Sequence, residues 1–195
     1  RTEDEVGTQL RQFLHGAEID VTGISDVGIS SVVPNLTDVF LDYNRIADVS
    51  SLSSLTRLKR LHLPHNQLTN IAALSSLTSL VFLYLHSNQI SDISPLASIT
   101  NLSSLALTNN QVSDLFPLSS LVELDALDLS QNQIVDISPL ASLTGLGALG
   151  LGKNRISDIS ALSSLTTLYR LHLDSNHISD ISPLAGLTNL TDLFI

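Results

Sequence analysis

The chain has 195 residues, a formal net charge of -10 and only nine lysine and arginine residues. This charge argues against nucleic acid and against anionic membranes as partners, because both need a clustered basic surface. No cysteine occurs, which excludes disulfide bonds and thiolate chemistry. No run of about 18 apolar residues occurs either, so the sequence predicts no membrane insertion.

The N-terminal segment, residues 1–16, has the pattern of a helix. Thr2 and Glu5 have the spacing of a capping box, and apolar residues follow at helical spacing before Gly16. We expect this helix to cap one end of a core that the later residues form, because stacked repeats need such a cover. Residues 17–35 are expected to be a degenerate first repeat.

From residue 36 to residue 195 the sequence repeats every 22 residues, and the last repeat is incomplete. Seven asparagines mark the period without an insertion or a deletion: Asn44, Asn66, Asn88, Asn110, Asn132, Asn154 and Asn176. Aligned on them, each unit reads L-x-x-L-x-L-x-x-N-x-I-x-D-I-x-P-L-x-x-L-T-x, as in residues 80–101. This period and this leucine spacing are the pattern of leucine-rich repeats.

Each part of the unit predicts a local structure. The alternating leucines predict a short strand with two leucines turned inward, and stacked units would pair these strands in a parallel sheet. An asparagine side chain both donates and accepts hydrogen bonds, so we expect the seven asparagines to be structural. Prolines such as Pro95 favour a 3₁₀ turn, opened by an aspartate such as Asp92, over a full α-helix.

The predicted fold is therefore an α/β, right-handed leucine-rich-repeat solenoid. We expect a curved horseshoe with a parallel β-sheet on its concave side, 3₁₀ turns on its convex side and the helical cap at its N-terminal end. At the other end, a new strand begins at Leu190 and the sequence stops at Ile195. Because an uncovered strand edge invites pairing, we expect the chain to continue in the full protein or to dimerise through this C-terminal edge.

The amino-acid sequence of the repeats also resembles that of a known family. The segments "NQISDISPLASITNL" (residues 88–102) and "NQIVDISPLASLTGL" (residues 132–146) resemble the internalin-like leucine-rich repeats of bacterial surface proteins. In that family a helical cap precedes the repeats, an immunoglobulin-like segment often follows, and the concave sheet commonly binds a host protein during adhesion or invasion. The resemblance implies a secreted or cell-surface bacterial protein, while the residues themselves leave a cytoplasmic location open.

Candidate binding residues come from the outward positions of the strands and from their margins. They are Phe40, Tyr43, Arg60, His62, His65, Phe82, Tyr84, His86, Tyr169, Arg170, His172 and Phe194. Exposed aromatic residues with arginine and histidine are the composition of an interaction hot spot. Phe40, His62 and Tyr84 would form a ladder about 10 Å long across three strands. The same ladder could instead stiffen the sheet, because aromatic residues suit strands.

These residues predict a protein–protein interaction module, adhesin-like, that binds a protein ligand on its concave face, with a host surface protein as one candidate. The alternative is a structural spacer that presents another domain of a longer surface protein. We expect no enzymatic activity, because no motif brings Ser, His and Asp together, and we expect no cofactor. We also expect no metal site, because His172 would lie roughly 24 Å from His62, too far to share an ion with it.

Overall fold

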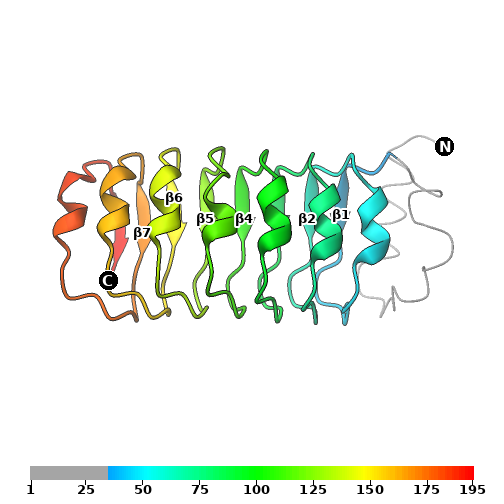
Figure 1. Ribbon diagram of the computed structural model, residues 1–195, viewed down its shortest axis with the longest axis horizontal. Helices are drawn as coiled ribbons and strands as arrows, with labels where there is room; N and C mark the ends of the chain where they lie inside the picture. The colour runs from blue at the N-terminus through cyan, green and yellow to red at the C-terminus, as the bar shows by residue number, and fades with distance from the viewer. Residues whose placement is uncertain (1–34) are drawn as a thin grey trace.

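The computed structural model describes residues 35–195, which form a solenoid of stacked short strands and 3₁₀ helices (Figure 1). The expected cap helix, residues 1–16, and the expected degenerate repeat, up to residue 34, lie outside the described residues. The eight strands are β1 (Asp38–Phe40), β2 (Arg60–His62), β3 (Phe82–Tyr84), β4 (Ser104–Ala106), β5 (Ala126–Asp128), β6 (Ala148–Gly150), β7 (Arg170–His172) and β8 (Asp192–Phe194).

The 3₁₀ helices lie on the opposite side of the solenoid from the strands, as Figure 1 shows. They are η2 (Ser50–Ser54), η3 (Ala72–Ser76), η4 (Ser94–Ser98), η5 (Phe116–Leu118), η6 (Ser138–Ser142), η7 (Ser160–Ser164) and η8 (Ser182–Gly186). Among residues 35–195 no helix has the length and apolar character that crossing a membrane requires.

The strands form one open parallel sheet in sequence order from β1 to β8. Each strand pairs with the next in a register of 22 residues, so that Phe40 lies beside His62 and His62 beside Tyr84. Backbone hydrogen bonds extend this pairing past the strand ends, as from the Leu41 N–H to the His62 carbonyl at 2.8 Å. Equivalent residues of successive units therefore stand in columns. The structure confirms the predicted leucine-rich-repeat solenoid with its parallel sheet and 3₁₀ turns.

The core lies between the sheet and the 3₁₀ helices and is a single cluster of leucine, isoleucine and valine side chains. The central residue of each strand from β2 to β7 points into it, and Leu61, Leu83 and Leu171 are completely buried. Burying one such side chain stabilises the fold by roughly 1.5–3 kcal/mol relative to leaving it exposed. The leucine pattern of the sequence is therefore the main source of stability.

The asparagine column connects each unit to the one before it. Oδ1 of Asn88 accepts the N–H of Leu68 at 3.0 Å, and Nδ2 donates to the carbonyls of Leu63 and Leu85, both at 2.9 Å. The same set of bonds recurs at every asparagine of the column from Asn66 to Asn176. Each side chain thus satisfies backbone groups where the chain leaves its strand.

A side-chain oxygen of aspartate, or of Asn70 in one unit, fixes the start of each 3₁₀ helix. Oδ1 of Asp92 accepts the Ser94 N–H at 2.8 Å, although Asp92 stands one residue before Ile93, the N-cap of η4. The bond is therefore that of an Asx turn. It also lowers the pKa of Asp92 below its usual value, because the Ser94 N–H, and after it the Ser94 hydroxyl, stabilise the carboxylate.

Serine hydroxyls link neighbouring units on the side of the 3₁₀ helices. The Ser76 hydroxyl donates to the Ser53 carbonyl at 2.6 Å, and the Ser98 hydroxyl donates to the Ser75 carbonyl at 2.8 Å. These bonds are exposed to solvent, so each contributes little by itself. Because such bonds recur between neighbouring units, these serines have a structural role.

One column of residues has a left-handed backbone, just beyond the carboxyl ends of the strands. Tyr43, His65, Ser87, Asn109, Gln131, Lys153 and Ser175 all have φ between 54° and 58°. None of these residues is glycine, and this conformation costs an ordinary side chain roughly 1–2 kcal/mol. Each unit therefore stores some backbone strain at this turn.

Replacing Gln131 with glycine should raise the free energy of unfolding by about 0.5–1 kcal/mol, because glycine adopts positive φ without that cost. Gln133 is the matched control, since it is also exposed but has no positive φ. Gln133→Gly should lower the free energy of unfolding, because glycine only adds entropy to the unfolded chain there. Urea unfolding of both variants measures the difference, and equal effects would contradict the strain.

Candidate functional site

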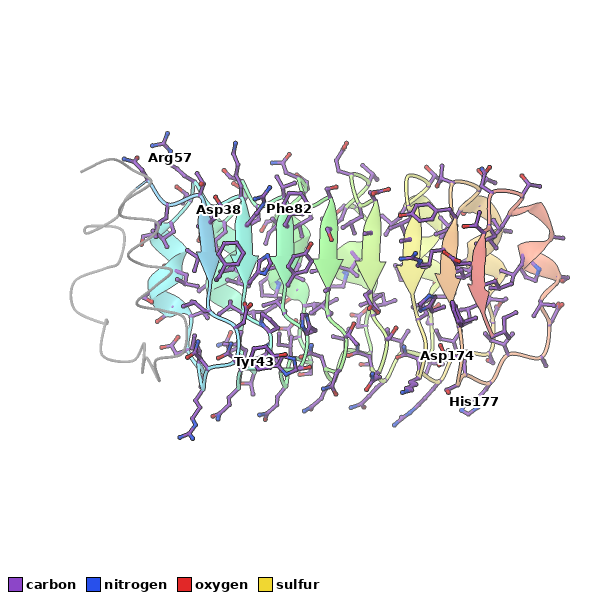
Figure 2. The ribbon with its side chains drawn as sticks, turned by 180° about the vertical axis from the view of Figure 1, so that it is seen from behind. Asp38, Tyr43, Arg57, Phe82, Asp174 and His177 are labelled. Atoms are coloured by element: carbon purple, nitrogen blue, oxygen red, sulfur yellow. The ribbon has the colours of Figure 1, made fainter. Side chains whose placement is uncertain are left out.

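The sheet turns the first and third side chains of each strand away from the core, and we call this surface the sheet face. Figure 2 shows the molecule from this side, with Phe82 on the third strand. Eight of the predicted binding residues belong to the sheet face: Phe40, Arg60, His62, Phe82, Tyr84, Arg170, His172 and Phe194. The other four, Tyr43, His65, His86 and Tyr169, lie in the segments that adjoin the strands.

Three rings stack across β1, β2 and β3 in the predicted ladder. The centroids of Phe40 and His62 are 4.4 Å apart with the rings tilted by 56°, and those of His62 and Tyr84 are 4.5 Å apart in an edge-to-face contact. All three side chains remain partly exposed. Edge-to-face and tilted contacts of this kind are favourable for aromatic pairs, so the ladder is a preformed surface.

Arg60 covers the adjacent column of the sheet face. Its guanidinium carbon lies 5.2 Å from the centroid of the Phe82 ring, and its Nη1 lies 3.5 Å from Oδ1 of Asp38. A cation over an aromatic face is attracted by the ring quadrupole. The ion pair with Asp38 and the contact with Phe82 together hold Arg60 flat across three strands.

A second stack stands beside the ladder, at the carboxyl ends of the strands. The rings of Tyr43 and His65 are parallel within 9° at 4.2 Å, and His86 meets the edge of His65 at 5.5 Å. Tyr43, labelled at this edge in Figure 2, is 77% exposed. Both Tyr43 and His65 have the left-handed backbone that recurs at this position in every unit, so the repeat itself places their side chains at this edge.

The remaining predicted residues form a separate cluster on β7 and β8. The rings of His172 and Phe194 are 4.6 Å apart, and Arg170 pairs with Asp192 at 3.3 Å. Tyr169, which precedes β7, is 44% exposed. The cluster repeats the ring pair and the ion pair of β1 and β2 with the order of the strands reversed. The structure therefore divides the predicted residues between two ends of the sheet face.

Between these two clusters the sheet face is hollowed. The hollow has a volume of about 290 Å³ and opens to solvent. It is lined by Tyr84, Ser104, Leu105, Ala106, Ala126, Leu127, Asp128, Ala148, Leu149, Gly150, Arg170 and His172. It exists because the outward positions of β4, β5 and β6 carry alanine, serine and glycine almost throughout.

The predicted binding residues do not include the acidic side chains of the sheet face, Asp38, Asp128 and Asp192, or Asp42, which follows β1. Asp38 and Asp192 each lie one strand from the arginine that they pair with. The 22-residue separation within each pair is a signal that could have identified both. Asp42 and Asp128 carried no such signal. Asp42 keeps Oδ1 buried without a hydrogen-bond partner in the described part of the chain, and Asp128 lies in the hollow.

The histidines of the N-terminal cluster have lowered pKa values. Burial is the main cause of the lowered pKa of His62, and Arg60 and His86 lower it further while Asp42 opposes them. Burial is also the main cause of the lowered pKa of His86, followed by the neighbouring His65. Burial thus favours the neutral form of both imidazoles.

These shifts predict a loss of stability in mild acid. Because the pKa of His62 and of His86 is lower in the folded than in the unfolded chain, the unfolded chain binds protons first below about pH 6.5. The corresponding stability is present above this pH and is lost as the pH falls through the lowered pKa values. We expect the urea midpoint to fall between about pH 7 and about pH 5, and to fall less in a His62→Gln, His86→Gln variant.

The control for this experiment is His177→Gln, because His177 is exposed and lies outside both clusters. This variant should keep the pH dependence of the wild type. If the double variant also keeps the pH dependence of the wild type, the imidazoles of His62 and His86 do not cause the loss of stability.

The side chains of the sheet face are suited to non-covalent binding. They offer rings, imidazoles and paired charges, and no observation on the described residues indicates catalysis. Within residues 35–195, no group of three or more His, Asp or Glu side chains converges in a way that could hold a metal ion. The fold that carries this face, a leucine-rich-repeat solenoid, is a protein-interaction module.

Comparison with known proteins gives the same class. The family model described as leucine-rich repeats, two copies, matches residues 34–76, 56–98, 78–120, 100–142, 122–164 and 148–186. The crystal structure of an internalin C2 from Listeria monocytogenes is 43% identical, with a TM-score of 0.81 over 83% of this chain and 71% of that one. No curated protein matches the chain.

Two further solved structures share the fold. A leucine-rich-repeat protein of Leptospira interrogans is 28% identical, with a TM-score of 0.79 over 86% of this chain and 44% of that one. A plant peptide hormone receptor, solved in complex with RGF2, is 25% identical, with a TM-score of 0.70 over 80% of this chain and 27% of that one. The chain belongs to the leucine-rich-repeat family and, within it, is an internalin-like bacterial protein, which confirms the predicted resemblance.

Proposed function

We propose that this protein is an adhesin-like module that binds a protein ligand on its sheet face, the face expected to be concave. The observation that carries the proposal is the aromatic ladder of Phe40, His62 and Tyr84. The leucine core needs no aromatic residue on the outer surface of the sheet. Because these rings already pack against one another, they lose little conformational entropy on binding. Such a preorganised surface favours recognition.

The ligand that we propose is a surface protein of a host, and the location is the bacterial surface or the medium. The support for both is the 43% identity with internalin C2 over most of the chain and the resemblance of the repeat wording to bacterial surface proteins. The plant peptide hormone receptor, whose fold is similar, was solved in complex with RGF2.

A spacer that merely presents another domain is the second candidate. A spacer needs a stable, polar rod, and the serine and asparagine columns supply one. It does not need exposed rings, yet Tyr43 is 77% and Tyr169 is 44% exposed. Exposed aromatic residues gathered in two clusters favour binding over spacing.

The test is to capture partners from host-cell extracts with the wild type and with a variant whose sheet face is blocked. Ala126 lies in the hollow, so Ala126→Trp adds a bulky ring there without entering the core. Val135→Trp is the control, because Val135 is 57% exposed and lies outside the strands. We expect Val135→Trp to hold the same partner as the wild type and Ala126→Trp to lose it. Equal capture by all three proteins would place binding outside the hollow, and the Phe82→Ala, Tyr84→Ala variant would then test the ladder.

A further inference from the structure

We infer that the hollow of the sheet face receives a basic side chain of the partner, a lysine or an arginine, with Asp128 as its counter-ion. The inference rests on the proposed function, because it assigns chemistry to one part of the same face.

The register leaves Asp128 between two very small residues. Ala106 on β4 and Gly150 on β6 lie directly beside it. One strand further out on each side, Tyr84 and His172 line the hollow. The carboxylate thus stands exposed at the centre of a recess with a ring at either end, where a side chain of the partner can reach it.

The orientation of the carboxylate depends on the missing side chain of β6. Oδ1 of Asp128 accepts the Ser130 N–H at 3.0 Å. The same oxygen lies over Gly150, where an added Cβ would collide with it and would come within 3.0 Å of the Ser130 hydroxyl oxygen. Glycine at this position therefore keeps the recess open, and the hydrogen bond holds the carboxylate in place.

The charge of the recess is unbalanced. Within residues 35–195, Asp128 has no cation within ion-pair distance. The other charged residue that lines the hollow, Arg170, is already paired with Asp192 at 3.3 Å. A carboxylate only accepts hydrogen bonds, so its complement is a cationic donor. A negative recess in a chain of net charge -10 also attracts basic partners over a distance.

The walls of the recess suit the rest of a basic side chain. Ala106, Ala126 and Ala148 offer an apolar floor for the methylene stem, as lysine and arginine prefer. Tyr84 offers an aromatic ring to a cation.

The test uses random twelve-residue peptides displayed on phage and selected on the immobilised wild-type protein. Selected peptides are synthesised and titrated against Asp128→Asn, which keeps the acceptor for the Ser130 N–H but removes the charge. The control is Asp125→Asn, an exposed aspartate of the same unit outside the hollow. We expect selected peptides to contain lysine or arginine, to bind Asp128→Asn about tenfold more weakly, and to bind Asp125→Asn as the wild type.

A second measurement makes the same change in the peptide. Replacing its basic residue by glutamine should weaken binding to the wild type about tenfold and should not weaken binding to Asp128→Asn further, because the two changes remove one interaction. Independent effects of the two changes would overturn the inference. So would equal losses in both aspartate variants, selection of peptides without basic residues, or a failure to select any peptide.

The Ala126→Trp variant separates this inference from the proposed function. Peptides that lose binding to Ala126→Trp but bind Asp128→Asn normally would keep the sheet face as the binding surface and overturn the counter-ion. Peptides that bind both variants normally would overturn the counter-ion. They would contradict the proposed function as well if they also bind the Phe82→Ala, Tyr84→Ala variant normally, since they would then attach outside the sheet face.

Discussion

Replacing Asn88 with alanine should lower the free energy of unfolding by about 1–3 kcal/mol. The side chain is only 9% exposed and bonds three backbone groups, the Leu68 N–H and the carbonyls of Leu63 and Leu85. Alanine leaves the Leu68 N–H without a partner in the interior, which costs about 1–3 kcal/mol. The carbonyls of Leu63 and Leu85 each lose one of two bonds, because Asn66 and Asn110 also donate to them. The loss should extend beyond one unit, because two of these three groups belong to the preceding unit.

Urea unfolding followed by circular dichroism measures this loss, and Asn101→Ala is its control. Asn101 also donates to a carbonyl of the preceding unit, that of Thr78 at 2.9 Å, but it is exposed. Water can replace an exposed bond, so this variant should lose no more than about 0.5 kcal/mol. Similar losses in the two variants would mean that the buried column is not what holds successive units together.

Removing Phe82 and Tyr84 together should weaken binding of a captured partner about 100-fold or more. Hot-spot residues each contribute about 2 kcal/mol or more on truncation, and about 2.7 kcal/mol corresponds to 100-fold. Phe82 lies under the guanidinium of Arg60, and Tyr84 closes the ladder on His62. A Phe82→Ala, Tyr84→Ala variant therefore removes both the rings and the support of their neighbours.

The double variant should still fold, because both side chains are partly exposed and the core leucine between them is unchanged. Its control is Phe116→Ala, Val135→Ala. These two apolar side chains are 74% and 57% exposed and lie outside the strands. The control should bind as the wild type in a calorimetric titration. If the control lost binding and the Phe82→Ala, Tyr84→Ala variant kept it, the recognition surface would lie on the side of the 3₁₀ helices and not on the sheet.

Most of the fold could be predicted from the sequence because a solenoid repeats one local pattern. The leucine alternation specified the strands, and the 22-residue spacing of the asparagines specified the register that places Phe40 beside His62. The same periodicity would have predicted the pairing of Arg170 with Asp192, since both stand at the same position of successive units.

The site could be predicted only in part, because its shape depends on backbone angles and on missing side chains. The sequence does not show that Tyr43 and His65 have a left-handed backbone. Nor does it show that their rings form a separate parallel stack. The small residues of β4 to β6 looked featureless in sequence. Only the way in which Asp128 extends over Gly150 shows that they form a charged recess.

The most direct test of the central claim is hydroxyl-radical footprinting of the protein with and without its captured partner. Mass spectrometry would compare the labelling of Phe82 and Tyr84 on the sheet face with that of Phe116 in η5. We predict that the partner lowers labelling of Phe82 and Tyr84 and leaves Phe116 unchanged. Protection of Phe116, with Phe82 and Tyr84 labelled as in the free protein, would contradict binding on the sheet face.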